Sequence, residues 1–286
     1  MRKIFTALTV VASVAISGGT ALGADFDAAK MDAVLEAQPD IIKARYKYRH
    51  PKETLAFFGV EPGMTVADTL AGEYYSRILL PYLGDEGKLL GVSYALSQRA
   101  IDYKDNAKRM ADYRNWPTHF VEKAEAWRGG SKAEISSFLF DDMPADVKGT
   151  VDVFLMMRSM HHLNKYEDNG NRLTKALADV YAALKPGGVL GVVQHRAPAD
   201  ISDEWAKGFK GYVKQEPLIA AVKAAGFEFV ASSEINANPK DKPTEADYVW
   251  RLPPVLAGSD KGSEKYKMLK AVGESDRMTL KFRKPE

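Results

Sequence analysis

The sequence predicts an α/β protein built on a mostly parallel, seven-stranded sheet whose last strand is antiparallel. Residues 64–93 hold an apolar run, a glycine turn, a helical apolar stripe and a second apolar run, the pattern of a βαβ unit. Further apolar runs at 151–157 and 189–193 have the composition of strands buried on both faces. Met278–Phe282 alternates between apolar and polar residues, which predicts the final antiparallel strand.

Composition places the chain among ordinary globular proteins. Its 286 residues are 45% hydrophobic and 27% charged, enough for one large domain with extensions. It contains no cysteine, which excludes disulfides, thiolate catalysis and cysteine metal sites.

The first 23 residues have the pattern of a cleavable signal peptide. A basic start, Met1–Lys3, precedes the apolar run Ile4–Ser17 and the small residues Ala21–Gly23. The alternative, a membrane anchor, is disfavoured because the apolar run is too short to span a bilayer. We therefore expect a periplasmic or secreted protein beginning at Ala24, with no membrane contact after cleavage.

Cleavage would also remove the small excess of positive charge. The remaining chain carries 38 Lys and Arg against 38 Asp and Glu. A formally neutral chain predicts no general attraction to nucleic acid, so a small molecule is the expected partner. The oligomeric state is not predicted by any pattern in the sequence.

Residues 24–50 are expected to form an N-terminal helical extension to a domain spanning 51–286. Its basic end, Lys43–Pro51, has two interpretations. One is a solvated helix face. The other is a lid over a ligand site.

The remaining elements follow from periodicity and from turn residues. A long helix is expected over 96–115, ended by Pro117, and a weak third strand over 118–122. The sixth strand is expected at 227–230, after a helical insertion over 203–213.

Four segments, residues 49–84, 151–163, 184–197 and 216–241, together resemble class I S-adenosylmethionine-dependent methyltransferases. The resemblance is nearest to a group of exported bacterial proteins predicted to be methyltransferases. It implies a Rossmann-like methyltransferase fold and S-adenosylmethionine as cofactor.

The resemblance places the cofactor at the turn after the first strand. It implies contacts from Asp68, Ala71, Gly72, Glu73 and Tyr75. Alanine and glutamate stand where the family often has glycine. Glu73 would either crowd the pocket or meet a positive group of the cofactor, and Asp68 could equally satisfy backbone donors in its own turn.

At the tip of the second strand the family carries an acid that binds both ribose hydroxyls, and this chain has Ser93 there. A serine accepts one hydrogen bond but does not replace a bidentate carboxylate. Asp141 or Asp142 could receive the adenine amino group, or could simply be solvated.

The ends of the fourth and fifth strands supply the candidate catalytic residues. The resemblance maps an arginine and a histidine onto Arg158 and His161, and His195 would face the same cleft. His161 is either a base or a loop-holding side chain. Metal binding through His161, His162 and His195 ranks lower, because no carboxylate accompanies them at ligand spacing, so no metal is predicted.

These observations favour a methyltransferase acting on an unidentified small molecule. The main alternative is an exported binding or accessory protein that kept the fold and lost the cofactor. A third possibility is a different enzyme that uses the histidine and arginine cluster.

Overall fold

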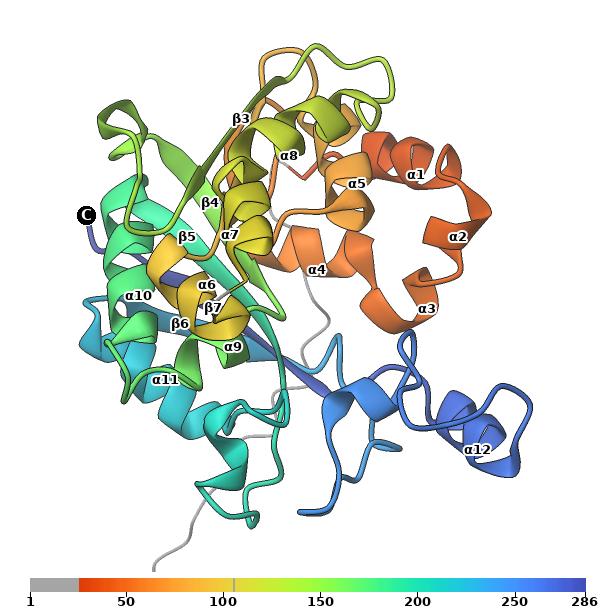
Figure 1. Ribbon diagram of the computed structural model, residues 1–286. Coiled ribbons are helices and arrows are strands. Elements are labelled where there is room, and N and C mark those ends of the chain that lie inside the picture. Colours follow the sequence, from red (N-terminus) through yellow and green to blue (C-terminus); the bar gives the residue numbers. More distant parts are fainter. Residues whose placement is uncertain (1–25, 105) are drawn as a thin grey trace, which may run out of the picture.

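The computed structural model describes residues 26–104 and 106–286 (Figure 1). The predicted signal peptide, residues 1–23, lies outside the described residues. No helix in the described part of the chain is long and apolar enough to cross a membrane.

One seven-stranded sheet organises the described chain, in the strand order β3-β2-β1-β4-β5-β7-β6. Strands β1 to β5 run parallel, and β7 pairs antiparallel with both β5 and β6. The predicted mostly parallel sheet with an antiparallel last strand is confirmed. The strands are β1 (Thr65–Thr69), β2 (Lys88–Ser93), β3 (Glu134–Leu139), β4 (Val151–Met157), β5 (Leu184–His195), β6 (Glu228–Ser233) and β7 (Arg277–Arg283).

Helices cover both faces of the sheet, as Figure 1 shows. Successive residues of β1 face opposite cores: Val66 packs into one and Ala67 into the other. The Val66 side is covered by α1 (Ala28–Glu36), α4 (Pro51–Phe58), α5 (Glu73–Leu83) and α8 (Trp116–Glu125). The Ala67 side is covered by α9 (Met160–Asn164), α10 (Arg172–Ala183) and α11 (Gln215–Ala224).

Residues 26–49 form short helices that pack on this domain. Helix α1 lies against α4 and α5, and the ring of Phe26 contacts that of Tyr82. Two four-residue helices follow, α2 (Asp40–Lys43) and α3 (Tyr46–Arg49). Helix α3 lies beside the chain that leads into β7, and α12 (Glu264–Val272) lies nearby in Figure 1.

The prediction of a third strand at 118–122 is wrong, because these residues belong to α8. Pro117 lies in the first turn of that helix, where a missing N–H costs nothing, rather than ending a helix. Phe120 and Ala124, four residues apart, are its buried face. The true third strand, β3, is more polar and lies at the sheet edge, so its hydrophobic pattern is weak.

Two predicted helices are also divided or shortened. The helix expected over 96–115 is two helices, α6 (Leu96–Tyr103) and α7 (Ala107–Arg114), and Lys104 between them has a φ of 48°. A left-handed residue cannot continue a right-handed helix. The helical insertion expected over 203–213 contains only the short 3-10 turn Trp205–Lys207.

Gly91 allows α8 to approach the sheet, and replacing it with alanine should destabilise the protein by about 1–3 kcal/mol. A Cβ at Gly91 would overlap the ring of Phe120. That ring cannot retreat freely because Trp116 stacks on it at 5.4 Å between centroids. Denaturant unfolding of Gly91→Ala tests the cost. The same change in a Phe120→Leu background should cost less, and equal costs in both backgrounds would contradict this contact.

Candidate functional site

The candidate site lies at the carboxyl ends of β1, β4 and β5. Leu70 and Arg158 directly follow β1 and β4, and their φ values are 57° and 59°. Each N–H still donates to a neighbouring strand, Leu70 to Val92 at 2.8 Å and Arg158 to Val193 at 2.6 Å. Such conformations are disfavoured for residues with a Cβ and concentrate at functional sites. Both residues border the pockets described next.

A pocket of about 210 Å³ follows β1, and we call it the turn pocket. Asp68, at the end of β1, lies at its base with only 3% exposure and with no hydrogen-bond partner for Oδ1 among the described residues. Burial raises the pKa of Asp68 to about 8, against the lowering effect of Arg158. The turn pocket is lined by Asp68, Thr69, Leu70, Gly72, Glu73, Tyr74, Tyr75, Met157 and Arg158.

Glu73 points along its own helix. Its Oε1 accepts a hydrogen bond of 2.7 Å from Nε of Arg77, one turn later in α5. The carboxylate of Glu73, a residue that lines the turn pocket, is therefore paired with a residue of its own helix. Gly72 has extended backbone, and a Cβ there would meet only the Leu70 carbonyl, at 3.7 Å. Glycine is therefore not sterically required at this position.

A second pocket of about 300 Å³ adjoins the turn pocket through Leu70, Met157 and Arg158, and we call it the histidine pocket. Three imidazoles line it together with the apolar residues of the segment 249–255. It is lined by Leu70, Met157, Arg158, His161, His162, His195, Val249, Trp250, Leu252, Pro253, Pro254, Val255, Glu274 and Ser275.

The three histidines of this pocket are held close together. The ring centroid of His161 lies 4.0 Å from that of His162 and 5.5 Å from that of His195. Gln194 contacts Nδ1 of His161 at 3.3 Å, and Ser275 Oγ lies 2.5 Å from Nδ1 of His195. Nε2 of His161 is buried and has no partner among the described residues.

Burial keeps these imidazoles uncharged. It lowers the pKa of His161 and His195 well below the usual value, and neighbouring histidines lower both further. Burial also lowers the pKa of His162 to about 3, with Lys165 and Arg99 adding to the effect. A neutral imidazole with an unpaired nitrogen is able to accept a proton or a hydrogen bond from a ligand.

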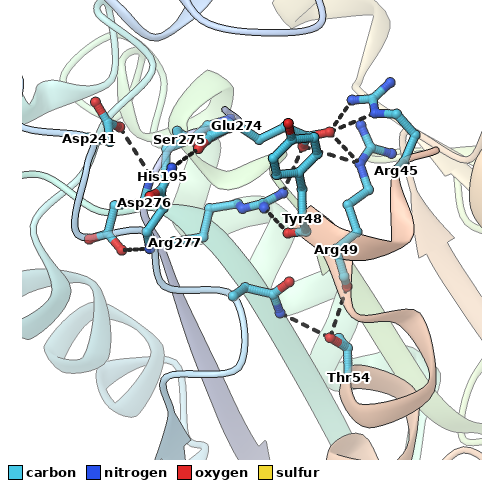
Figure 2. Close-up of polar contacts among 12 residues, drawn as sticks. Arg45, Tyr48, Arg49, Thr54, His195, Asp241, Glu274, Ser275, Asp276 and Arg277 are labelled. Carbon is cyan, nitrogen blue, oxygen red and sulfur yellow. Dashed lines mark hydrogen bonds and ion pairs between the residues drawn. The ribbon is translucent and has the colours of Figure 1, made fainter. Parts of the chain in front are cut away.

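An arginine network built on Glu274 closes one side of the site (Figure 2). Glu274 accepts hydrogen bonds from Arg45 and Arg49 of the N-terminal helices and from Arg277 of β7. Arg277 also donates to the backbone carbonyl of Tyr48. Burial alone would raise the pKa of Glu274, but Arg49, Arg277, Arg158 and Arg45 outweigh it and hold that pKa below its usual range.

The network includes one end of the basic segment at residues 43–51. Arg49 is 5% exposed, and its guanidinium lies 4.4 Å from the ring centroid of Tyr74, a residue of the turn pocket. Arg49 is therefore packed against the turn pocket, whereas Lys47 of the same segment is exposed.

The structure brings most of the predicted site residues together. Asp68, Gly72, Glu73 and Tyr75 line the turn pocket, His161 and His195 line the histidine pocket, and Arg158 lines both.

Ala71 and Ser93 line neither pocket, and both are buried. Ser93 Oγ lies 2.7 Å from the hydroxyl of Tyr113, which in turn donates to the carbonyl of Tyr94 at 2.8 Å. Tyr113 of α7 therefore covers the Ser93 hydroxyl at the tip of β2.

Three contributors were not foreseen: Glu274, Arg277 and Trp250. Glu274 lies in irregular chain before β7, Arg277 is the first residue of β7, and Trp250 lies in the short 3-10 turn Val249–Arg251. No apolar period marks any of these positions. One signal could have identified Glu274 and Arg277. Three of the four residues in the run Glu274–Arg277 are charged, and this run leads into an apolar strand. Within residues 26–104 and 106–286, no group of three or more His, Asp or Glu side chains is placed to hold a metal ion.

Glu274→Gln should lower the free energy of unfolding by about 3–5 kcal/mol, because it leaves buried arginines without their counter-charge. The comparison is Glu234→Gln. Glu234 pairs with Arg196 at 2.7 Å but its side chain is 66% exposed, so its loss should cost about 0–1 kcal/mol. Urea unfolding at pH 7 measures both. Similar losses in the two variants would refute the structural role of the Glu274 network.

Comparison with known proteins gives one curated relative and many similar structures. The relative is an uncharacterized methyltransferase, YdaC, from Bacillus subtilis, 32% identical over 98 residues. That match covers 33% of this chain and 51% of the relative, so the chain spans about half the length of the relative it matches. No family model matches the chain.

The similar structures share the fold at low sequence identity. The cyclase SpnF superposes with a TM-score of 0.52 at 17% identity, covering 83% of this chain and 80% of that one. A Galdieria sulphuraria protein, provisionally assigned as a sarcosine dimethylglycine methyltransferase, gives 0.50 at 15% identity and covers 88% and 89%. The chain therefore has the fold of class I S-adenosylmethionine-dependent methyltransferases, and the resemblance drawn from its sequence is confirmed.

Proposed function

We propose that the protein is an S-adenosylmethionine-dependent methyltransferase acting on a small molecule. The observation that carries the proposal is the unpaired, buried carboxyl of Asp68 in the turn pocket, immediately beside the uncharged histidines. In open α/β sheets, ligands bind outside the carboxyl end of the strands, where these pockets lie.

The residues of the turn pocket fit the amino-acid end of the cofactor. Oδ1 of Asp68 lacks a partner, and a ligand ammonium would supply one. The N-terminus of α5, with Gly72 as its cap residue, presents backbone N–H groups without a side-chain cap. When bound, S-adenosylmethionine would supply an electrophilic methyl group.

The histidine pocket fits the acceptor. Nε2 of His161 is the buried, unpaired atom that would take the proton from an acceptor hydroxyl or amine. Leu252, Pro253 and Pro254 would exclude water from the acceptor. Neutral His195, held by Ser275, would add no positive charge of its own beside His161.

The alternative, an exported binding or accessory protein, is favoured by one observation. The Ser93 hydroxyl is sealed by Tyr113, so neither pocket extends to the tip of β2. A nucleoside would need Tyr113 to leave this position. The cyclase SpnF also illustrates that this fold does not by itself imply methyl transfer.

Export through the N-terminal segment is part of the proposal. Met1–Lys3 and Ile4–Ser17 support it. Intact-mass analysis of the protein expressed in a bacterial host should find a chain beginning at Ala24 in the periplasm or medium. An intact Met1 in the cytoplasm would contradict export.

Binding of S-adenosylhomocysteine, the demethylated product, tests the cofactor. Its ammonium needs ionised Asp68, whose pKa is about 8 in the ligand-free protein. Affinity should therefore rise with pH up to about 8, by at most about tenfold per pH unit for one proton lost. Calorimetry from pH 6 to pH 8.5 measures this.

Two controls isolate the role of Asp68. Asp68→Asn should weaken binding and remove the pH dependence. 5′-Methylthioadenosine lacks the amino-acid end, so its affinity should not depend on pH. A slope that persists in Asp68→Asn would place the titrating group elsewhere, and no binding of either nucleoside at millimolar concentration would favour the accessory role.

His161→Asn should lower methyl transfer by about 100- to 10,000-fold, the usual loss on removal of a general base. Asparagine keeps a polar atom near Nδ1 for Gln194 but lacks Nε2. Transfer of labelled methyl groups to phenols and amines measures the rate, with exposed His119→Asn on α8 as control. A large fall in melting temperature with little loss of rate per folded molecule would instead make His161 structural.

A further inference from the structure

The site carries more positive charge than its carboxylates balance. Arg45, Arg49 and Arg277 share one carboxylate, that of Glu274. Arg158 makes no side-chain hydrogen bond or salt bridge with any residue in the described part of the chain, although it borders both pockets. Burial, reinforced by Arg49 and Arg277, lowers the pKa of Arg158 to about 9. An arginine placed so unfavourably is expected to have a ligand as its partner.

Asp68 does not neutralise Arg158 at neutral pH. Its pKa of about 8 leaves it mostly protonated at pH 7, and the two side chains form no ion pair. Glu274 is already engaged by three guanidinium groups. Arg158 therefore has no counter-ion among the described residues, and a ligand would have to supply the negative charge. A carboxylate binds the planar guanidinium with two hydrogen bonds.

The wall of the histidine pocket facing solvent selects a different part of the ligand. It consists of Val249, Trp250, Leu252, Pro253 and Pro254. Arg251, which lies among them in sequence, does not line the pocket and is paired with Asp241 and Asp247. The Trp250 ring lies 6.0 Å from that of His161, between centroids. A pocket of about 300 Å³ with one flat aromatic wall accepts a single ring more readily than a long chain.

We propose that the histidine pocket binds a small organic anion with a flat apolar body, its carboxylate on Arg158 and its body against Trp250. This inference rests on the proposed function only in naming the anion as the methyl acceptor. The cofactor also contains a carboxylate, and Arg158 borders the turn pocket too, so the two sources must be separated by experiment.

Three fragments separate charge from shape: benzoate, benzamide and acetate. Ligand-observed NMR titration of the full chain at pH 7 should show benzoate binding at least tenfold more tightly than benzamide, which lacks the charge. The affinity for benzoate should also be at least tenfold higher than that for acetate, because acetate lacks the ring. Equal binding of benzoate and benzamide would overturn the proposal, as would no benzoate binding at millimolar concentration.

Arg158→Met should reduce benzoate affinity to that of benzamide. Because it removes a partly buried charge that has no partner among the described residues, it should not lower the melting temperature, which separates lost binding from lost structure. Arg283→Met is the matched control, since Arg283 lies exposed at the opposite end of β7, paired with Val189 rather than near His195. Unchanged benzoate binding in Arg158→Met would overturn the assignment. So would an equal loss in Arg283→Met.

Saturating S-adenosylhomocysteine identifies which carboxylate Arg158 serves. Benzoate should bind equally well in its presence if the anion is the acceptor. If S-adenosylhomocysteine displaces benzoate and 5′-methylthioadenosine does not, Arg158 serves the cofactor's carboxylate and the proposal fails.

The two proposals can fail separately. Benzoate binding without any nucleoside binding would leave the anion site standing and remove the methyltransferase function. Nucleoside binding without benzoate binding would support the methyltransferase function and remove the anion site.

Discussion

The contact on which the site depends is the buried carboxylate of Glu274 with its three arginines. Arg45 and Arg49 lie more than 220 positions away in sequence, at the end of the N-terminal helices. Their attachment to Glu274 holds α3 against the chain before β7. It also sets Arg49 on the ring of Tyr74 at the rim of the turn pocket. One carboxylate thereby joins the two ends of the described chain over the carboxyl edge of the sheet.

This arrangement places charge where a ligand site needs it. Three arginines around one acid leave a positive field, and Arg158 enters that field with no partner of its own among the described residues. Burying unpaired charge costs stability, so a chain keeps such a residue only if something else compensates. Left-handed backbone at Leu70 and Arg158 adds a second cost at the same edge. Both costs fall at residues that border the two pockets.

Much of the fold could be predicted because buried parallel strands and amphipathic helices leave periodic patterns. The strand at 151–157 was predicted with its observed bounds, since every side chain but Asp152 is buried. The prediction failed where the pattern was weak or tertiary contacts decided. Residues 118–122 have alternating strand-like character, yet Phe120 and Ala124 pack on Gly91 and the sheet as a helix. Edge strand β3, exposed on one side, carried too few apolar residues to be recognised.

The site was predicted in outline for a similar reason. Strand ends are visible in the sequence, so Asp68, Arg158, His161 and His195 could be located before any contact was known. Partners that reach the site from irregular chain could not, because Glu274 and Trp250 belong to no periodic element. Ser93 shows the limit most clearly. The tip of β2 was correctly located, but the contact with Tyr113 depends on how α7 packs, which no local pattern specifies.

The turn pocket and the tip of β2 therefore differ in how far they are open to a ligand. The turn pocket has an acid without a partner and matches what the fold leads one to expect. At the tip of β2, where the fold would place a nucleoside, tyrosine side chains occupy the space. If Tyr113 can leave Ser93, the missing carboxylate at position 93 costs affinity but does not block entry. If it cannot, the histidine pocket and Arg158 still form a complete anion site that needs no nucleoside. The position of Tyr113 on α7 therefore bears directly on whether a nucleoside reaches the tip of β2.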